Sequence, residues 1–414
     1  MNTFSLRIAM VSIHSSPIGD VGTRDTGGMS VYIRELTKEL GRLGHRVDIY
    51  TCPLCPKDSH VVELSENVRL INICIGKGAY LPKLKLYSYL PDFFRRIEGF
   101  RSAQGLHYDL IHSHYWLSGC LGNWAKECWD VPHVIKFHTL GAAKNHAKPG
   151  TREPELRIAA EKKLSKTCDR IVVSAEKEKE NLIRYYNVPR HKIGVVPCGV
   201  NLHLFHPVDK AGARRCAGFA QDASVILYVG RFDPLKGIER LLEAVVYLRH
   251  LKRCRLVIIG GDDYQSFSSQ KILKLVRKLG IKDIVDFTGR IEQDTLNTYY
   301  NAADVLVVPS FYESFGLVAL ESLACGTPVI ATPVGAMESI IRTSETGQVL
   351  LDSSPRSLAR AIEAFIAKQH AKTISPQTVR ASVRKFGWSH MASAIMDEYA
   401  TAFHARQNAR ALAL

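Results

Sequence analysis

The stretch Asp304-Val305-Leu306-Val307-Val308-Pro309, followed after three residues by Glu313-Ser314-Phe315-Gly316-Leu317-Val318-Ala319-Leu320-Glu321, decides the fold. The first run predicts a buried apolar strand, and the second predicts a glycine-containing helix start just beyond it. A helix start presents unpaired N–H groups and the positive end of the helix dipole, which suit a phosphate. This passage from strand to helix therefore indicates an α/β domain with an anion site at the edge of its sheet.

Two carboxylates bracket that helix start. Glu313 is predicted on the loop before the helix, and Glu321 about five residues inside it, roughly 7–8 Å further along. Phe315, Gly316 and Leu317 would meet a pyrophosphate at the helix start. Ionised carboxylates accept pairs of hydroxyl hydrogen bonds, so one could hold a hexose and the other a ribose. We interpret the segment as a nucleotide-sugar site; the alternative is a pair of solvated acids at a helix end.

Short β-branched runs alternate with helical patterns along the whole chain, which predicts βαβ units and parallel sheets. The strands expected in the first half span residues 6–13, 46–51, 68–73, 109–114, 133–139, 170–174 and 193–197. Those expected in the second half span 225–229, 256–260, 285–289, 305–309 and 329–331. The pattern predicts two doubly wound α/β domains, 1–205 and 206–385, with ligands in a cleft at the carboxyl ends of the strands.

Length and composition agree with a globular protein of two domains. The chain has 414 residues, 46% of them hydrophobic and 23% charged, and it shows neither a signal-peptide pattern nor an apolar run long enough to span a bilayer. Its ten cysteines are scattered, and only Cys52 and Cys55 form a C-x-x-C. We therefore expect a cytoplasmic protein with free thiols and no metal site.

The net charge of +15 suggests three kinds of anionic partner, a nucleic acid, an anionic membrane face or small anionic substrates, but the charge alone does not decide among them. No basic segment with interleaved aromatic residues resembles a nucleic-acid-binding motif, so no nucleic-acid partner is predicted. Arg95, Arg96 and Arg101 beside Phe93 and Phe94 could face a membrane, but a half-buried helix with a solvated face is the favoured explanation. The sequence leaves open both a weak peripheral contact with an anionic membrane and a homodimer.

A basic loop opens the second domain with Gly230-Arg231-Phe232-Asp233-Pro234-Leu235-Lys236-Gly237. Arg231 and Lys236 would project from this loop into the cleft, where a planar fork and a point charge can share a diphosphate. Such cations stabilise the negative charge that develops on a leaving phosphate. The alternative is a solvated loop before a helix.

In the first domain, Thr26-Gly27-Gly28-Met29 lies between the first strand and a helix. It lacks the G-x-G-x-x-G spacing of dinucleotide-binding proteins, which argues against a dehydrogenase. Its two glycines still let backbone N–H groups meet a phosphate, unless they form only a flexible turn. His138, at the end of another predicted strand, is a candidate site residue, whereas His112 and His114 are more typical of structural histidines.

These motifs, together with Phe386-Gly387-Trp388-Ser389 before a final helix, resemble those of the family 4 retaining glycosyltransferases. The resemblance extends over nearly the whole chain. It implies the GT-B fold, in which two Rossmann-like domains face each other across a cleft and a C-terminal segment, here 386–414, crosses back to the first domain. Within the family, residues 14–17, 26–32 and 112–119 look most like D-inositol 3-phosphate glycosyltransferases, and sucrose-phosphate synthases are near relatives. Ser30 departs from the Asn common in the inositol enzymes, which leaves the acceptor and the donor sugar open.

The resemblance implies roles for single residues. Arg231, Lys236 and the backbone of Gly28 would hold the donor diphosphate, Glu321 the ribose and Glu313 the sugar hydroxyls. The residues implied to act in catalysis are His138, Arg231, Lys236 and Glu313. The residues implied to bind the donor are Gly27, Gly28, Arg231, Lys236, Arg290 (beside the uracil), Glu313, Phe315, Gly316, Leu317 and Glu321. The residues implied to grip an acceptor phosphate are Lys83, Tyr115, Thr139 and Arg157.

The implied reaction moves a hexosyl group, with retention, from a nucleotide diphosphate sugar, expected to be UDP-linked, to a hydroxyl of a small phosphorylated acceptor, either a sugar phosphate or a cyclitol phosphate. No Asp-x-Asp metal motif occurs in the sequence, so no cofactor is expected beyond the nucleotide sugar, which is the donor substrate. Three alternatives stay open. They are a sucrose-phosphate-synthase-like enzyme that uses a hexose phosphate, a lipid-directed mannosyltransferase at the inner membrane face, and a non-enzymatic module that binds an anionic polymer.

Overall fold

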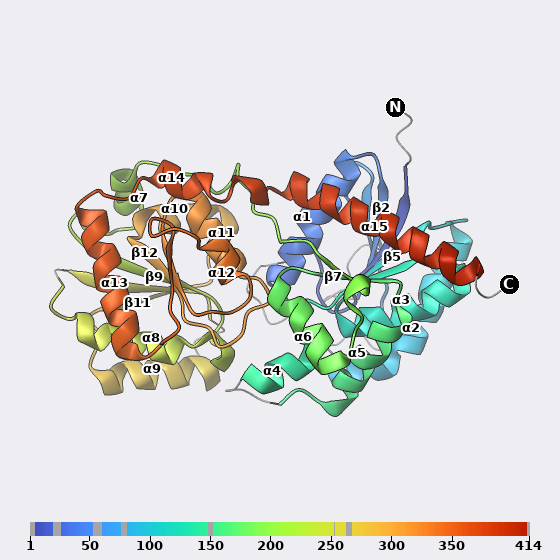
Figure 1. Cartoon of the computed structure of the whole chain (residues 1–414), viewed down its shortest axis with the longest axis horizontal. Coiled ribbons are helices and arrows are strands. Elements are labelled where there is room, and N and C mark those ends of the chain that lie inside the picture. The colour runs from blue at the N-terminus through green and yellow to red at the C-terminus, as the bar shows by residue number, and fades with distance from the viewer. Residues whose placement is uncertain are drawn as a thin grey trace.

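Two lobes, each built around a sheet flanked by helices, make up the protein (Figure 1). The computed structural model describes residues 5–19, 26–52, 60–75, 81–147, 152–251, 253–261 and 267–411. Cys55, half of the predicted C-x-x-C pair, lies outside these residues. The long C-terminal helix α15 (Trp388–Ala411) runs from the second lobe across the first, in red in Figure 1.

The first lobe holds an eight-stranded sheet in the order β3-β4-β2-β1-β5-β6-β7-β8, in which only the β3–β4 pair is antiparallel. Its strands are β1 (Arg7–Val11), β2 (Arg46–Thr51), β3 (Val61–Ser65), β4 (Val68–Asn72), β5 (Leu110–His114), β6 (His133–Lys136), β7 (Arg170–Val173) and β8 (Ile193–Val195). Its helices are α1 (Gly28–Arg42), α2 (Lys83–Ala103), α3 (Tyr115–Trp129), α4 (Gly141–Ala147), α5 (Glu155–Thr167) and α6 (Glu176–Tyr186).

The second lobe holds a six-stranded parallel sheet in the order β11-β10-β9-β12-β13-β14. Its strands are β9 (Ser224–Val229), β10 (Cys254–Ile259), β11 (Val285–Gly289), β12 (Val305–Val308), β13 (Val329–Ala331) and β14 (Gly347–Val349). Its helices are α7 (Lys210–Cys216), α8 (Ile238–Val245), α9 (Phe267–Leu279), α10 (Gln293–Ala302), α11 (Leu317–Ala324), α12 (Met337–Ile340), α13 (Pro355–His370) and α14 (Pro376–Ala381).

Both sheets are doubly wound, as predicted. The strand order reverses between β1 and β5 in the first sheet and between β9 and β12 in the second. Ligands of open α/β sheets bind where the order reverses, outside the carboxyl ends of the strands. The loops with Gly27 and Gly28, with Arg231 and Lys236, and with Glu313 follow β1, β9 and β12. The topology therefore brings the three predicted anion-binding segments to the switch points.

Every strand predicted from the sequence forms, and the differences lie at edges and ends. The two strands that were not predicted, β3 and β14, are edge strands, one half-exposed along its length and the other only three residues long. Strand β6 was predicted to reach Thr139 but ends at Lys136. The physical reason is that His138 has φ +60°, a left-handed conformation that no strand can contain.

The predicted return of the chain to the first lobe is confirmed by the packing of α15. This helix contacts α1 and β7, and the Tyr399 hydroxyl lies 2.8 Å from His112 Nδ1 inside the first lobe. The two segments that pass between the lobes lie side by side, since Val200 N donates to Phe386 O at 2.7 Å. The domain limits at residues 205 and 385 remain a prediction.

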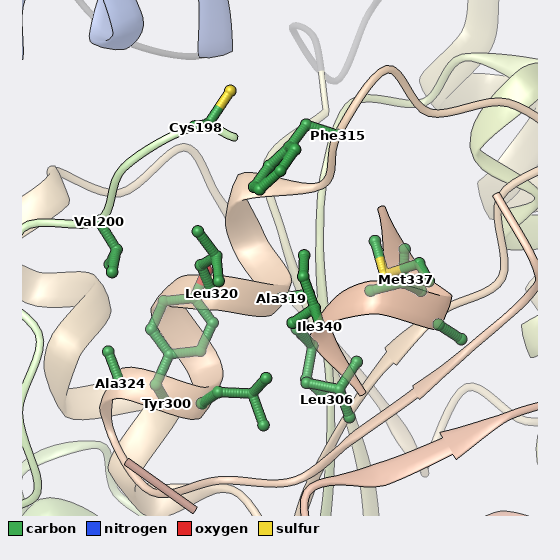
Figure 2. Packing of buried hydrophobic residues seen from close by; sticks show 14 of the residues in the cluster. Cys198, Val200, Tyr300, Leu306, Phe315, Ala319, Leu320, Ala324, Met337 and Ile340 are labelled. Atoms are coloured by element: carbon green, nitrogen blue, oxygen red, sulfur yellow. The ribbon is translucent and has the colours of Figure 1, made fainter. Parts of the chain in front are cut away.

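Helix α11 rests on an apolar core that fixes its position (Figure 2). Phe315, Ala319 and Leu320 lie in one cluster with Met337 and Ile340 of α12. Gly316 is required at the helix start because it has φ +108° and an added Cβ would lie 2.0 Å from Met337 Cε. Within the described ranges, no helix is both long and apolar enough to cross a bilayer.

Candidate active site in the cleft between the lobes

A cleft of about 500 Å³ lies between the two lobes, at the carboxyl ends of both sheets. All the predicted site residues line it, from both lobes. Among the described residues, no group of three His, Cys, Asp or Glu side chains could hold a metal ion. The structure therefore brings the predicted donor and acceptor residues to one place, while their individual roles stay predictions.

A larger cavity, of about 710 Å³, lies at the amino ends of strands in the second sheet, opposite the cleft. Its arginines are paired within the protein: Arg253 with Asp222, Arg255 with Asp286, and Arg249 with carbonyl oxygens. None of the predicted site residues lines this cavity. Because ligands of such sheets bind at the carboxyl ends of the strands, we place the site in the cleft between the lobes.

Lys236 and Glu313 form an ion pair on the second-lobe side of the cleft. Lys236 Nζ lies 2.7 and 2.8 Å from the two carboxylate oxygens of Glu313, and the Ser310 hydroxyl donates to Oε1 at 2.8 Å. The lysine is thus held in place but remains partly exposed to the cleft. A cation fixed in this way can meet a phosphate without reorganisation.

The loop that carries Lys236 is fixed by its own backbone. The Asp233 side chain accepts from Leu235 N at 2.9 Å and caps the short 3₁₀ helix η2 (Pro234–Lys236). Gly237 then takes φ +65°, where an added Cβ would lie 2.0 Å from Pro309 O. Phe311 N donates to Leu235 O at 2.7 Å. The Lys236 loop and the Glu313 loop are therefore packed together through backbone contacts that tolerate no side chain at position 237.

Two helix starts face each other across the cleft. Helix α1 begins at Gly28 and helix α11 begins at Leu317. A Cβ added to Gly28 would lie 3.3 Å from Leu317 Cδ1, so the two starts are close together. In the part of the chain that the structure describes, neither start is capped by a side-chain hydrogen bond or has an acidic residue in its first turn. Two positive helix ends with free N–H groups suit one anion between them.

Glu321 lies inside α11, on the inner wall of the cleft, and is only 8% exposed. The Tyr300 hydroxyl donates to its Oε2 at 2.7 Å. Burial raises the pKa of Glu321, against the opposing hydrogen bonds from Tyr300 and Gln293. Gln293 in turn accepts from Arg34 of α1 at 2.6 Å, so this carboxylate is connected to the first lobe.

His138 is held by both lobes. Its Nε2 lies 2.8 Å from His114 Nδ1, and its carbonyl oxygen accepts a hydrogen bond from the Ser314 hydroxyl of the second lobe. Nearby, Leu140 N donates to the Tyr312 hydroxyl at 3.2 Å. The strained left-handed conformation of His138 is thus stabilised by residues on either side of Glu313, as strain at functional sites commonly is.

Lys136 is a cleft residue that the sequence analysis missed. It ends β6, is buried, donates to the Ser174 hydroxyl and lies 4.8 Å from the ring centroid of Tyr32. Burial and, next, the charge of Lys136 lower the pKa of His138, so its imidazole is neutral at physiological pH. A lysine at the end of an otherwise apolar strand was the signal that could have revealed it.

The predicted acceptor residues form one cluster on the first-lobe side. The Arg157 guanidinium carbon lies 4.8 Å, and Lys83 Nζ 5.6 Å, from the ring centroid of Tyr115. Arg157 Nη2 donates to the backbone and side-chain oxygens of Thr139 at 2.8 and 2.9 Å. Two further residues of this cluster, Lys144 and Glu153, were not predicted.

The buried histidines of the first lobe make its stability depend on pH. Burial lowers the pKa of both His112 and His133 to about 3, whereas an unfolded histidine titrates near 6.5. The unfolded state therefore binds protons that the folded state excludes, and stability falls as pH drops below about 6.5. Between pH 7.5 and 5.5 we expect these two histidines alone to account for a loss of about 2–3 kcal/mol. Thermal melts at both values should show a smaller drop for His133→Gln, and an unchanged drop for the exposed His107→Gln control.

The sequence itself matches two glycosyltransferase families, one on each lobe. The family described as "Glycosyltransferase Family 4" matches residues 26–204, and "Glycosyl transferases group 1" matches residues 209–381. A D-inositol 3-phosphate glycosyltransferase of Catenulispora acidiphila is 36% identical over 411 residues, with 96% of each chain covered. The chain belongs to the family 4 glycosyltransferases.

Two solved structures share the fold of this enzyme. A sucrose-phosphate synthase from Thermosynechococcus elongatus is 35% identical, with a TM-score of 0.88, and the match covers 97% of this glycosyltransferase and 100% of the synthase. The Anabaena protein HepE, solved in complex with UDP and glucose, is 15% identical, with a TM-score of 0.75 over 95% and 99% of the two chains. The HepE likeness concerns the fold alone.

Proposed function

We propose that this glycosyltransferase transfers a hexosyl group, with retention, from a UDP-linked sugar to a hydroxyl of a small phosphorylated acceptor. The observation that carries the proposal is that two cationic side chains and two facing helix starts line the same cleft. Arg231 and Lys236 line the cleft beside the facing helix starts at Gly28 and Leu317. A diphosphate fits this arrangement, because cations and helix N-termini both bind phosphate groups.

The groups around this anion site suit the rest of a nucleotide sugar. Glu321, buried beside Tyr300, would accept the ribose hydroxyls, and Glu313 would accept those of the hexose. HepE binds UDP and glucose, and the similar chains named above act on, or make, phosphorylated small molecules by their names. Lys83, Thr139 and Arg157 supply a cationic, hydrogen-bonding place for an acceptor phosphate on the facing lobe.

In the proposed reaction, the bond between the anomeric carbon and the leaving phosphate oxygen breaks, and the acceptor oxygen bonds to that carbon from the same face. The acceptor proton passes to the leaving phosphate oxygen. Lys236, Arg231 and the helix ends stabilise the charge on the departing diphosphate. The neutral imidazole of His138 orients the reacting groups without adding charge, since burial lowers its pKa.

The proposal is tested by incubating the pure protein with UDP-, ADP- and GDP-sugars and following release of the free nucleoside diphosphate. D-inositol 3-phosphate and fructose 6-phosphate serve as acceptors, each beside its unphosphorylated counterpart. We expect release from a UDP-sugar only when a phosphorylated acceptor is present, with the product identified by mass spectrometry. Release that ignores the acceptor, or that occurs only with phospholipid vesicles, would contradict the proposal.

Within this proposal the acceptor has two candidates, an inositol phosphate and, as in a sucrose-phosphate-synthase-like activity, a hexose phosphate; the second is supported by the synthase structure, which matches this chain at a TM-score of 0.88. The same panel separates the two. Turnover with fructose 6-phosphate but not with the inositol phosphate would favour the second candidate.

A further inference from the structure

The acceptor side of the cleft contains a carboxylate, Glu153, bound to two cations. Glu153 Oε2 lies 2.8 Å from Arg157 Nη1, and Lys144 Nζ donates to Oε1. The Asn145 side chain holds the Glu153 backbone, accepting from its N–H at 2.7 Å and donating to its carbonyl at 3.3 Å. Glu153 lines the cleft and is 16% exposed. An anion of the protein itself therefore occupies the place where we expect the acceptor phosphate.

Arg157 meets protein oxygens on each of its three nitrogens. Nε donates to Glu161 at 2.7 Å, Nη2 donates to Thr139, and Nη1 faces Glu153. With its side chain only 2% exposed, Arg157 cannot turn toward a new partner while these contacts persist. A phosphate that is to bind Arg157 through two N–H groups must therefore replace one of the present oxygen partners.

The two carboxylates bound to Arg157 differ in how firmly they are held. Glu161 is fully buried and also accepts from Gly141 N at 2.9 Å and from the Tyr186 hydroxyl. Replacing it would leave those donors without an acceptor inside the protein, which is costly. Glu153 borders the open cleft, and water could solvate it when it moves away. Glu153 is the partner that can be exchanged.

The net charge of the acceptor-side cluster is suited to an exchange of Glu153 for a phosphate dianion. Among the described residues of this cluster, Lys83, Lys144 and Arg157 supply three positive charges, and Glu153 and Glu161 two negative ones. Burial opposes ionisation of Glu153, but Arg157 and Lys144 outweigh it and lower its pKa, so the carboxylate is charged at neutral pH. With Glu153 in place the cluster has a single net positive charge. Without it the net charge is two, which balances a phosphate dianion.

We propose that Glu153 determines acceptor specificity: it occupies Lys144 and Arg157 in the free enzyme and yields them to the dianionic phosphate of the acceptor. A neutral acceptor, or one with a weaker anion, leaves the carboxylate in place. The proposal rests on the proposed function, because it concerns the phosphate of the acceptor. It makes Glu153 a residue that weakens phosphate binding in exchange for selectivity.

The test measures binding of inorganic phosphate at about pH 8, where phosphate is mostly a dianion. Calorimetry compares the wild type with Glu153→Gln and with Glu155→Gln, an exposed glutamate two residues further along. Removing a like charge from a site shifts its affinity by about tenfold or more, by the usual size of such effects on a pKa. We expect Glu153→Gln to bind phosphate about tenfold more tightly than the wild type, and Glu155→Gln to match the wild type.

Unchanged, weaker or absent phosphate binding in Glu153→Gln would overturn the proposal. Glu153→Ala removes the same charge and gives the same reading if the glutamine variant folds poorly. UDP binding, measured on the same samples, separates this inference from the proposed function. If UDP binds all the variants but phosphate binds Glu153→Gln no more tightly, only the role of Glu153 fails. If UDP does not bind the wild type, the proposed function fails.

Discussion

Replacing Lys236 with alanine is expected to lower kcat about a hundredfold or more, by analogy with removing one fixed donor from an anionic transition state. Lys236 Nζ is held by both oxygens of Glu313, so its charge is already in place when the diphosphate begins to leave. The variant also leaves the Glu313 carboxylate unpaired beside that negative charge. The measurement is steady-state turnover with the nucleotide sugar and acceptor that the panel identifies.

Lys278→Ala, which removes an exposed lysine of α9, is the matched control and should keep normal turnover. UDP affinity should change less than kcat in Lys236→Ala, since the interaction strengthens as charge develops. Near-normal turnover in Lys236→Ala would remove this lysine from the proposed role.

Replacing Glu321 with glutamine is expected to weaken UDP binding about 10- to 100-fold, because hydrogen bonds to a charged group contribute about 1.5–3 kcal/mol. The glutamine keeps the size of the side chain and an oxygen for Tyr300, so the wall of the cleft should stay intact. Glu338→Gln, at an exposed position on α12, serves as the control.

A comparison of UDP with 2′-deoxy-UDP assigns that loss to the ribose. The wild type should prefer UDP, and the preference should largely disappear in Glu321→Gln, because the variant and the deoxy ligand remove the same interaction. An unchanged preference in the variant would show that Glu321 does not contact the ribose.

Much of the fold could be predicted because the periodicity of the apolar runs is strong. The strands β1, β9 and β12 are mostly buried and consist largely of continuous apolar runs. Strand β3 was not predicted because its side chains are half-exposed. Strand β14 was not predicted because it is only three residues long and starts at a glycine. Edge strands receive little help from burial, so their sequence pattern is weak.

The donor side of the site could be predicted because its residues form short linear motifs. Lys236, Glu313 and Glu321 lie at fixed distances from strand ends, and local backbone geometry fixes where they point. Lys136, Lys144 and Glu153 could not be found in this way. Their importance depends on which side chains of other elements they meet, such as Tyr32 for Lys136 and Arg157 for Glu153. Contacts between side chains of distant elements cannot be deduced from the spacing of residues in the sequence.

The paired passage of the chain between the lobes has a mechanical consequence. Val200 forms a bridge with Gly387, and Gly199 packs so tightly on Trp388 that an added Cβ would lie 2.4 Å from its indole ring. The two segments that connect the lobes are therefore joined to each other through their backbones. A joint of this kind constrains sliding and separation of the lobes more than it constrains rotation of one lobe about it. The hydrogen bond from the Ser314 hydroxyl to the carbonyl of His138 also joins the two lobes, so the relative position of the lobes sets the geometry around His138.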